Sequence, residues 1–252
     1  MLELDQVGVR FGGITALRNV TARLDGPAAV AVLGPNASGK TTLLRCLAGV
    51  LRPTTGSVRL DGRNLHRLRA RALARRLAYV PQQPDVAAGF TVQEVVRLGR
   101  YGLAPDDAAV ARACAAMELE DVLDRPFPQL SGGQQQRTGV ARALAQIESG
   151  GLLLLDEPTA AMDLHHVRTT ARLIPDLVRR DITVIFAMHD VALALALADV
   201  VWLLDAGRLV DAGPATEVAT AVRLAELFRV PFATYRGEAG RAVLLPRLLE
   251  AD

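Results

Sequence analysis

The sequence predicts an α/β fold with a mixed, mainly parallel sheet, an antiparallel β subdomain and an inserted α-helical subdomain. Three observations predict it: apolar and polar residues alternate over most of residues 2–60, helix signals dominate residues 82–147, and short apolar strands then alternate with helices. The last pattern is typical of a parallel sheet that helices cover on both faces. The chain has 252 residues, half of them hydrophobic, so it can bury a sizeable core and is not a disordered chain.

The N-terminal part is expected to be mostly β structure. Turn signals separate its strands, at Gly12-Gly13, Asp25-Gly26 and Asp61-Gly62. The exception is a helix after Lys40, where leucines recur at helical spacing until Gly49. A glycine in that place commonly ends a helix.

The middle of the chain is expected to be a helical insertion. Thr91 and Glu94 form a capping-box pattern, and an alanine-rich helix is predicted from Asp106 to Met117. Beyond the insertion, the pattern predicts a buried strand over 152–155, a helix over 164–180 and a strand over 182–187. Pro175 is expected to kink or split that helix, because proline lacks the N–H that a helix interior uses.

Composition excludes several classes of protein. The chain has 29 Lys and Arg against 27 Asp and Glu, so its net charge of +2 is too small for a nucleic-acid footprint. Cys46 and Cys114 lie far apart, which argues against a disulfide framework or a zinc site. The N-terminus carries Glu3 and Asp5 and is unlike a secretory signal, and charged residues interrupt the apolar region 182–205. We therefore expect a cytosolic chain with no membrane span.

Residues 33–49, LGPNASGKTTLLRCLAG, contain Gly-x4-Gly-Lys-Thr after an apolar run and before a helix. Such glycines let backbone N–H groups face a phosphate chain, while the lysine and the helix N-terminus supply positive charge. The threonine that follows the lysine would offer its hydroxyl to Mg²⁺. The alternative, a glycine-rich turn with a surface lysine, is disfavoured by the flanking strand and helix. The expected nucleotide contacts are Gly34, Pro35, Asn36, Ala37, Ser38, Gly39, Lys40, Thr41 and Thr42.

Two adjacent carboxylates, Asp156 and Glu157, follow the apolar run LLLL. Neighbouring side chains on a strand point in opposite directions, so the two can do different work. We assign Asp156 to Mg²⁺ and Glu157 to a water that attacks the γ-phosphate in line. Such a pair can also be an ordinary solvated loop entry, but a phosphate loop in the same chain favours the functional interpretation.

The segment LSGGQQQR, residues 130–137, contains a second glycine pair. Ser131 and Gln134 satisfy a capping-box pattern, which alone would explain them. A cap does not need Gly132 and Gly133, however, because glycine weakens a first helical turn unless something approaches the backbone closely. We interpret the segment as a second phosphate-binding surface at a helix N-terminus.

The chain resembles the nucleotide-binding subunits of ATP-binding cassette (ABC) transporters. The resemblance rests on five motifs that occur in this order: the phosphate loop, LSGGQ, LLLLDEP, AAMD and AMHD. The resemblance implies a P-loop NTPase core, an ABC ATPase domain over 1–230 with a helical subdomain at about 83–148, and a short tail over 231–252. The chain departs from the family at Ala37, where many members have glycine, and at Met162, where leucine is common. All residues expected for hydrolysis are present, so the resemblance implies an ATPase with ATP and Mg²⁺ as cofactors.

The resemblance also implies roles for individual residues. Phe11 would stack on adenine, with a strand residue of the core as the alternative interpretation. Gln82 would sense Mg²⁺ and the attacking water, and Gln83 is the less favoured candidate. Asp163 would communicate between paired subunits, and His189 would contact the γ-phosphate. Glu157, His189 and Gln82 are thus the expected catalytic residues, and Thr41, Gln82 and Asp156 the expected metal ligands; His165 and His166 are expected on a solvated helix face.

In this family two subunits meet head to tail, which implies that Ser131, Gly132, Gly133 and Gln134 of one copy close over ATP held by the other. The resemblance further implies separate permease subunits, an extracytoplasmic solute-binding protein and a peripheral place on the cytoplasmic face of the membrane. Residues 90–102 and the run RLAELFRVPF are most similar to importers of ferric siderophores, haem or cobalamin. The helix in residues 90–102 and the residues after Gln82 would form the groove for a coupling helix of the permease. Amino acids or another small solute remain alternatives, as do an exporter ATPase and a soluble ABC ATPase that acts on ribosomes or DNA ends.

Overall fold

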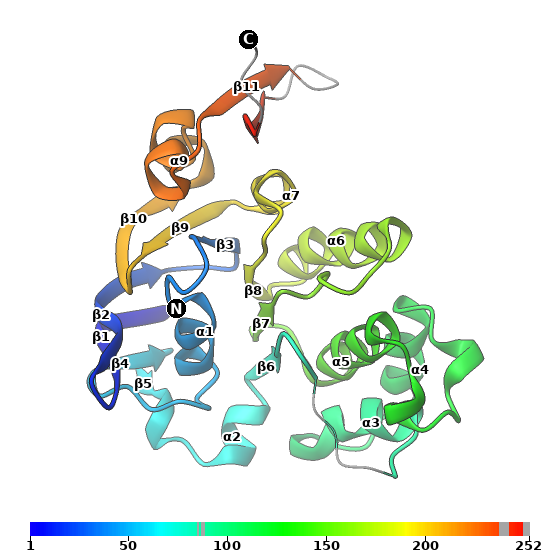
Figure 1. Ribbon diagram of the computed structural model, residues 1–252. Helices are drawn as coiled ribbons and strands as arrows, with labels where there is room; N and C mark the ends of the chain where they lie inside the picture. The colour runs from blue at the N-terminus through cyan, green and yellow to red at the C-terminus, as the bar shows by residue number, and fades with distance from the viewer. Residues whose placement is uncertain (85, 87–88, 237–241, 249–252) are drawn as a thin grey trace.

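A computed structural model describes residues 1–84, 86, 89–236 and 242–248. Residues 85 and 87–88 of the predicted helical subdomain, and 237–241 and 249–252 of the predicted tail, lie outside the described residues. Within these ranges the chain forms the predicted mixture of a mainly parallel sheet, an antiparallel sheet and a group of helices (Figure 1).

The central sheet has the strand order β10-β9-β3-β8-β7-β6. Its strands from β9 to β6 are parallel, and β10 is antiparallel to β9. The strands are β3 (Ala29–Leu33), β6 (Leu77–Val80), β7 (Leu152–Asp156), β8 (Thr183–Ala187), β9 (Val200–Asp205) and β10 (Arg208–Pro214). The near-continuous apolar runs of β3, β7 and β8 are buried throughout or nearly so, as a parallel sheet covered on both faces requires.

The N-terminal strands form a separate antiparallel sheet with the order β2-β1-β4-β5. These strands are β1 (Leu2–Phe11), β2 (Ile14–Leu24), β4 (Thr55–Leu60) and β5 (Arg63–Asn64). The predicted turns at residues 12–13 and 61–62 connect β1 to β2 and β4 to β5, which confirms them. Helix α1 (Lys40–Leu47) lies beside this sheet and ends before Gly49, whose φ of 72° is left-handed as expected of a helix-ending glycine.

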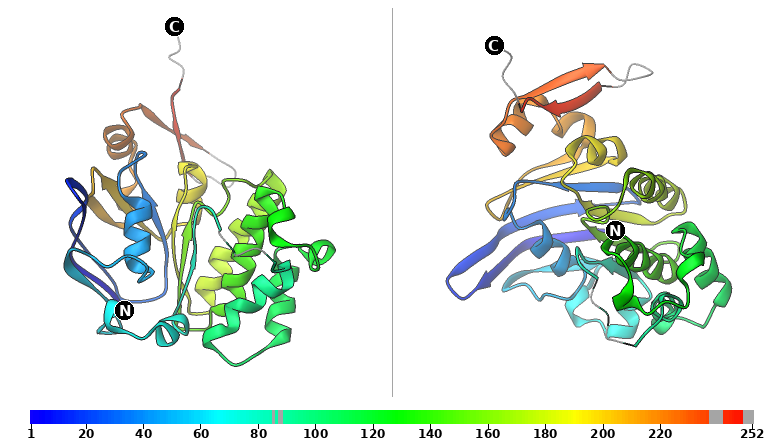
Figure 2. Two further views of the ribbon diagram at one scale, coloured as in Figure 1. Left: turned by 60° about the horizontal axis from the view of Figure 1, so that its bottom comes forward. Right: turned by 45° about the vertical axis from the view of Figure 1, so that its right-hand side comes forward.

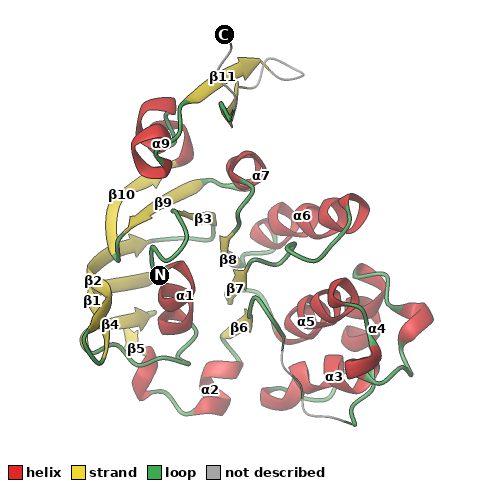
Figure 3. Cartoon of the chain, viewed as in Figure 1, coloured by secondary structure: helices red, strands yellow, loops and turns green. Residues whose placement is uncertain are grey.

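Helices gather on the opposite side of the central sheet, between β6 and β7 in the sequence (Figures 2 and 3). We call this group, from α3 to α5, the helical segment. It contains α3 (Val92–Leu98), the 3-10 turn Gly99–Gly102, α4 (Asp107–Ala116) and α5 (Gly132–Gln146). The predicted capping box of Thr91 and Glu94 is confirmed, and α4 matches the predicted helix, with Asp106 as its N-cap.

The remaining helices complete the layers. They are α2 (Ala70–Ala74), α6 (Leu164–Arg179), α7 (Val191–Leu197), α8 (Ala215–Val218) and α9 (Ala221–Phe228). The expectation that Pro175 splits its helix is wrong, because α6 runs through it without interruption. Pro175 is exposed, so its ring lies on the outer side of the helix.

Two apolar cores hold the layers together. Alternate residues of β3 face opposite cores: Ala29, Ala31 and Leu33 lie in the core on the side of α6 and α7, while Val30 and Val32 lie in the core with α1 and the antiparallel sheet. The phosphate loop that follows β3 is therefore held from both sides. The tail forms a hairpin that the sequence did not predict, β11 (Phe232–Arg236) with β12 (Ala242–Pro246), at the C-terminal end of the molecule.

Candidate functional site

The phosphate loop connects the buried strand β3 to the N-terminus of α1. Glycine is required at Gly34, because a Cβ there would lie 2.0 Å from the carbonyl oxygen of Leu204. Gly39 has a φ of 107°, which side chains rarely tolerate. Ala37, the position at which many relatives have glycine, also has a left-handed φ of 62°. The backbone conformation at this position therefore favours glycine, although the chain has alanine there.

Lys40 is 8% exposed and its side chain bends back over the loop. Its Nζ donates hydrogen bonds to the carbonyl oxygens of Gly34 and Pro35, at 2.8 and 3.0 Å. Burial lowers the pKa of Lys40, while the carboxylates of Glu157 and Asp156 oppose that shift. Lys40 is thus a cation of the loop interior and not the surface lysine of the alternative interpretation.

Asp156 is the last residue of β7 and lies against α1. Its carboxylate accepts hydrogen bonds from the Thr41 hydroxyl, at 3.2 Å, and the Tyr79 hydroxyl, at 3.4 Å. Burial raises the pKa of Asp156, and these hydroxyls together with nearby cations counteract part of the shift. The structure thus places a carboxylate and a hydroxyl, both predicted metal ligands, in direct contact.

Glu157 turns away from Asp156 toward His189, but it lies beyond the end of β7, so strand alternation does not set its direction. Its φ of 50° is left-handed, and its N–H donates to the carbonyl of Ala187 on β8. One carboxylate oxygen accepts from the His189 backbone N–H at 3.1 Å, and the other lies 3.4 Å from His189 Nε2. Burial raises the pKa of Glu157, and His189 is the largest influence in the opposite direction.

A cavity of about 520 Å³ opens in front of the phosphate loop. Of the predicted site residues, it is lined by Asn36, Ala37, Ser38, Gly39, Lys40, Thr41, Thr42, Gln82, Glu157 and His189. Ile14, Thr15 and Ala16, at the start of β2, also line it and were not predicted, since nothing distinguishes them from other strand residues. Phe11 is 51% exposed, so it is not the core residue of the alternative interpretation, and it pairs with Ile14 across the β1–β2 turn.

Ser131 to Gln134 are not among the described residues that line this cavity. They begin α5 with the predicted capping box: the Gln134 N–H donates to the Ser131 hydroxyl, and the Ser131 N–H donates to the Gln134 side chain. Ser131 and Gly132 are exposed. The predicted second phosphate-binding surface is therefore exposed at its first two residues.

At Gly133 the expectation that a phosphate accounts for the glycine is wrong. A Cβ at Gly133 would lie 2.6 Å from the carbonyl oxygen of Ala161, so the chain's own packing requires this glycine. At Gly132 the nearest atom would be the Ala161 Cβ at 3.5 Å, an ordinary contact. Only Gly132 is left without a packing explanation.

Asp163 lies outside the cavity, as the N-cap of α6. Its carboxylate accepts from the His166 backbone N–H at 3.0 Å and lies 2.8 Å from His166 Nδ1. The expectation for the two histidines is right for His165, whose side chain is 67% exposed, and wrong for His166, which is 22% exposed because it folds back onto this cap.

The residues of the cavity fit a nucleoside triphosphate with Mg²⁺. The Ser38 hydroxyl is buried and has no partner in the described part of the chain, so it is free for a phosphate oxygen beside Lys40 and the N-terminus of α1. Thr41, Asp156 and Gln82 offer oxygen ligands, which Mg²⁺ prefers. The described ranges hold no cluster of three or more His, Cys, Asp or Glu residues suited to a metal ion.

None of the helices in the described ranges combines the length and apolar character that crossing a bilayer needs.

The ABC transporter family model matches residues 17–160. The hemin import ATP-binding protein HmuV of Rhodopseudomonas palustris (strain BisB18) is 38% identical and covers 99% of this chain and 96% of its own length. HmuV of Streptomyces coelicolor is 42% identical over 88% of this chain and 81% of its own.

Solved structures agree with the sequence relatives. An inward-facing metal-chelate type ABC transporter matches with a TM-score of 0.78 and 26% identity, over 98% of this chain and 96% of its own. A dimeric ATP-binding cassette in a post-hydrolysis state with ADP and Pi matches with a TM-score of 0.77 and 27% identity, over 85% of this chain and 99% of its own. With the phosphate loop, the buried acidic pair and the LSGGQ cap in the arrangement described above, the chain belongs to the ABC transporter family, as one of its ATPases.

Proposed function

We propose that this ATPase powers the import of haem or a closely related metal chelate through separate permease subunits. The observation that carries the proposal is likeness over nearly the whole chain, tail included, to hemin import ATP-binding proteins and to a metal-chelate type transporter. The chain would sit on the cytoplasmic face of the membrane, with an extracytoplasmic solute-binding protein completing the system. The boundaries 1–230 for the ATPase domain, 83–148 for its helical subdomain and 231–252 for the tail are part of this proposal.

We infer a division of labour among the residues that line the cavity and those beside it. Lys40 and the loop N–H groups bind the phosphates, and Thr41, Asp156 and Gln82 hold Mg²⁺, which when bound neutralises charge on the phosphates. Glu157 accepts the proton of the attacking water, and His189, in contact with Glu157, faces the γ-phosphate. The adenine stacks on Phe11 at the end of β1.

The exposed Ser131 and Gly132 support a composite site. We propose that residues 131–134 of one copy close over ATP bound by a second copy, with Asp163 at the same interface. Loss of the γ-phosphate then removes contacts that hold the two copies together, which converts hydrolysis into opening of the pair.

Transport is tested by reconstituting the chain with its co-purified permease in proteoliposomes and supplying Mg-ATP on the side of the ATPase. We expect ATP-dependent movement of haem toward that side, and none with Lys40→Ala. Movement of a ferric siderophore or cobalamin in place of haem would show that haem is not the transported solute, but it would still support import. Movement of solute away from the ATPase side would contradict import and favour the exporter alternative.

The pH dependence of hydrolysis tests Glu157 as the base. Burial favours its protonated form, so its pKa lies above the ordinary 4.5 and the carboxylate forms only at correspondingly higher pH. We expect kcat to fall on the acid side with a midpoint above 4.5, and His189→Ala to move that midpoint upward, because His189 holds the pKa down. If Glu157→Gln retained the same acid limb in its residual rate, another group would be the base.

A further inference from the structure

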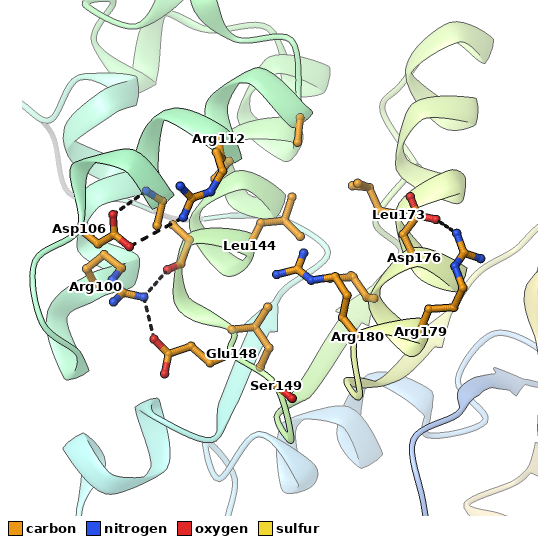
Figure 4. Close-up of a pocket in the computed structure, with 16 residues that line it drawn as sticks. Arg100, Asp106, Arg112, Leu144, Glu148, Ser149, Leu173, Asp176, Arg179 and Arg180 are labelled. Carbon is orange, nitrogen blue, oxygen red and sulfur yellow. Dashed lines mark hydrogen bonds and ion pairs between the residues drawn. The ribbon is translucent and has the colours of Figure 1, made fainter.

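The helical segment and α6 face each other across an open cleft of about 770 Å³ (Figure 4). Charged side chains line both walls, and all of them except Arg180 are paired on their own side. Arg112 pairs with Asp106 and Arg100 with Glu148 on the wall of the helical segment, whereas Arg179 pairs with Asp176 within α6. No ion pair or hydrogen bond between the side chains drawn in Figure 4 crosses the cleft.

The polar connection between the two walls is made elsewhere, by Glu118. Among the residues that the structure describes, every hydrogen bond and ion pair between residues 83–148 and α6 ends on the Glu118 carboxylate. It lies 2.9 Å from His165 Nε2 and 3.8 Å from His166 Nε2, and it accepts from the Thr169 hydroxyl at 3.1 Å.

Glu118 is held in place by its own backbone. Its φ of 52° is left-handed, a conformation that a side chain adopts only when the surroundings impose it. The buried Arg137 of α5 donates from one guanidinium nitrogen to the carbonyl oxygens of Met117, at 2.7 Å, and Glu118, at 2.6 Å. The carboxylate is thus fixed to the helical segment and aimed at α6.

On α6, these contacts lead to Asp163. His166, which the Glu118 carboxylate approaches from one side, lies 2.8 Å from the Asp163 carboxylate through its other ring nitrogen. The loop before Asp163 also supplies the Ala161 carbonyl that packs on Gly133 at the start of α5. Glu118, His166 and Asp163 therefore form one continuous polar path from the helical segment to the loop that we place at the composite site.

We propose that Glu118 is a positioning residue that ties the Asp163 loop to the helical segment, so that movement of the segment displaces the loop. The inference rests on the proposed composite site only for the role of Asp163. Both partners of the Glu118–His165 pair are substantially exposed, and exposed pairs contribute little to stability. A purely structural role would therefore leave hydrolysis unchanged, whereas a positioning role acts on the rate.

The first test compares Glu118→Ala with Glu120→Ala, an exposed glutamate two residues away without a hydrogen bond or ion pair among the described residues. Coupling contacts of this kind change rates by roughly 2- to 30-fold, and we expect Glu118→Ala to lower kcat about 5- to 10-fold. We expect KM for ATP to stay within about twofold and the melting midpoint within about 2 °C. Equal kcat in the two variants would overturn the proposal.

Two further variants separate positioning from general damage. Glu118→Gln keeps an acceptor for the Thr169 hydroxyl, so we expect it to restore part of the lost rate. Glu118→Ala combined with His166→Ala should be no slower than the slower of the two single variants, because the effects of residues on one path are not additive. If the fold-reductions in kcat of the two single variants multiplied in the double variant, the proposed path would be overturned.

A distance measurement tests the connection between the Asp163 loop and the helical segment without relying on ATP hydrolysis or on dimer formation. Spin labels at Arg112→Cys and Asp176→Cys report the width of the cleft, since these residues lie on opposite walls (Figure 4). The native Cys46 and Cys114 are buried. We expect a narrow distribution that broadens with Glu118→Ala and not with Glu120→Ala. An unchanged distribution would overturn the tie, whereas failure of import or of dimer formation would leave this readout unaffected.

Discussion

Lys40→Ala is expected to abolish nucleotide binding, with Kd for Mg-ATP raised at least about 100-fold and hydrolysis undetectable. Lys40 is the cation buried in the phosphate loop, and a water-filled gap left by alanine cannot replace its charge-assisted hydrogen bonds. Calorimetric titration with Mg-ATP measures the affinity directly.

The control for this loss is Arg18→Ala, which also removes one positive charge but at an exposed position of β2 that does not line the cavity. It should bind Mg-ATP as the parent does. Circular dichroism should show Lys40→Ala to be folded, because burial already disfavours its charge. A Kd within threefold of the parent would remove Lys40 from the phosphate site.

Glu157→Gln is expected to lower kcat by roughly 10²- to 10⁴-fold and to leave ATP affinity nearly unchanged. The amide keeps the size of the side chain and can still accept from the His189 N–H, but it cannot take a proton from water. Single-turnover hydrolysis and equilibrium titration on the same sample separate the two quantities. Glu226→Gln, at an exposed position of α9, is the matched control and should hydrolyse ATP at the parent rate.

Local signals were enough to predict much of the fold. Capping residues at Thr91, Asp106 and Ser131 marked helix starts that the structure confirms, because a cap is decided by residues within one turn. The glycines and lysine of the phosphate loop could be recognised because the sequence also predicts a buried strand before them and a helix after them. The different partners of Asp156 and Glu157 were also expected, although Glu157 owes its direction to a left-handed φ after the end of β7 and not to strand alternation.

Other features depend on contacts between distant segments and could not be predicted. Gly133 is required by the carbonyl of Ala161, and Glu118 gains its partners only when α6 packs beside the helical segment. Ile14 to Ala16 line the cavity because β2 passes the phosphate loop, not because of their residue types. The sequence also did not show that α6 would continue through Pro175, which lies at an exposed position of that helix.

The central claim is that two copies share the ATP site, and the most direct test is the mass of Glu157→Gln in solution. Light scattering with and without Mg-ATP should show a monomer that becomes a dimer only when ATP is bound. Ser131→Arg in the same background should abolish the dimer while ATP still binds, since Ser131 is exposed and does not line the cavity of its own chain. A Glu157→Gln sample that binds ATP and stays monomeric, or a Ser131→Arg variant that still forms the dimer, would contradict the account.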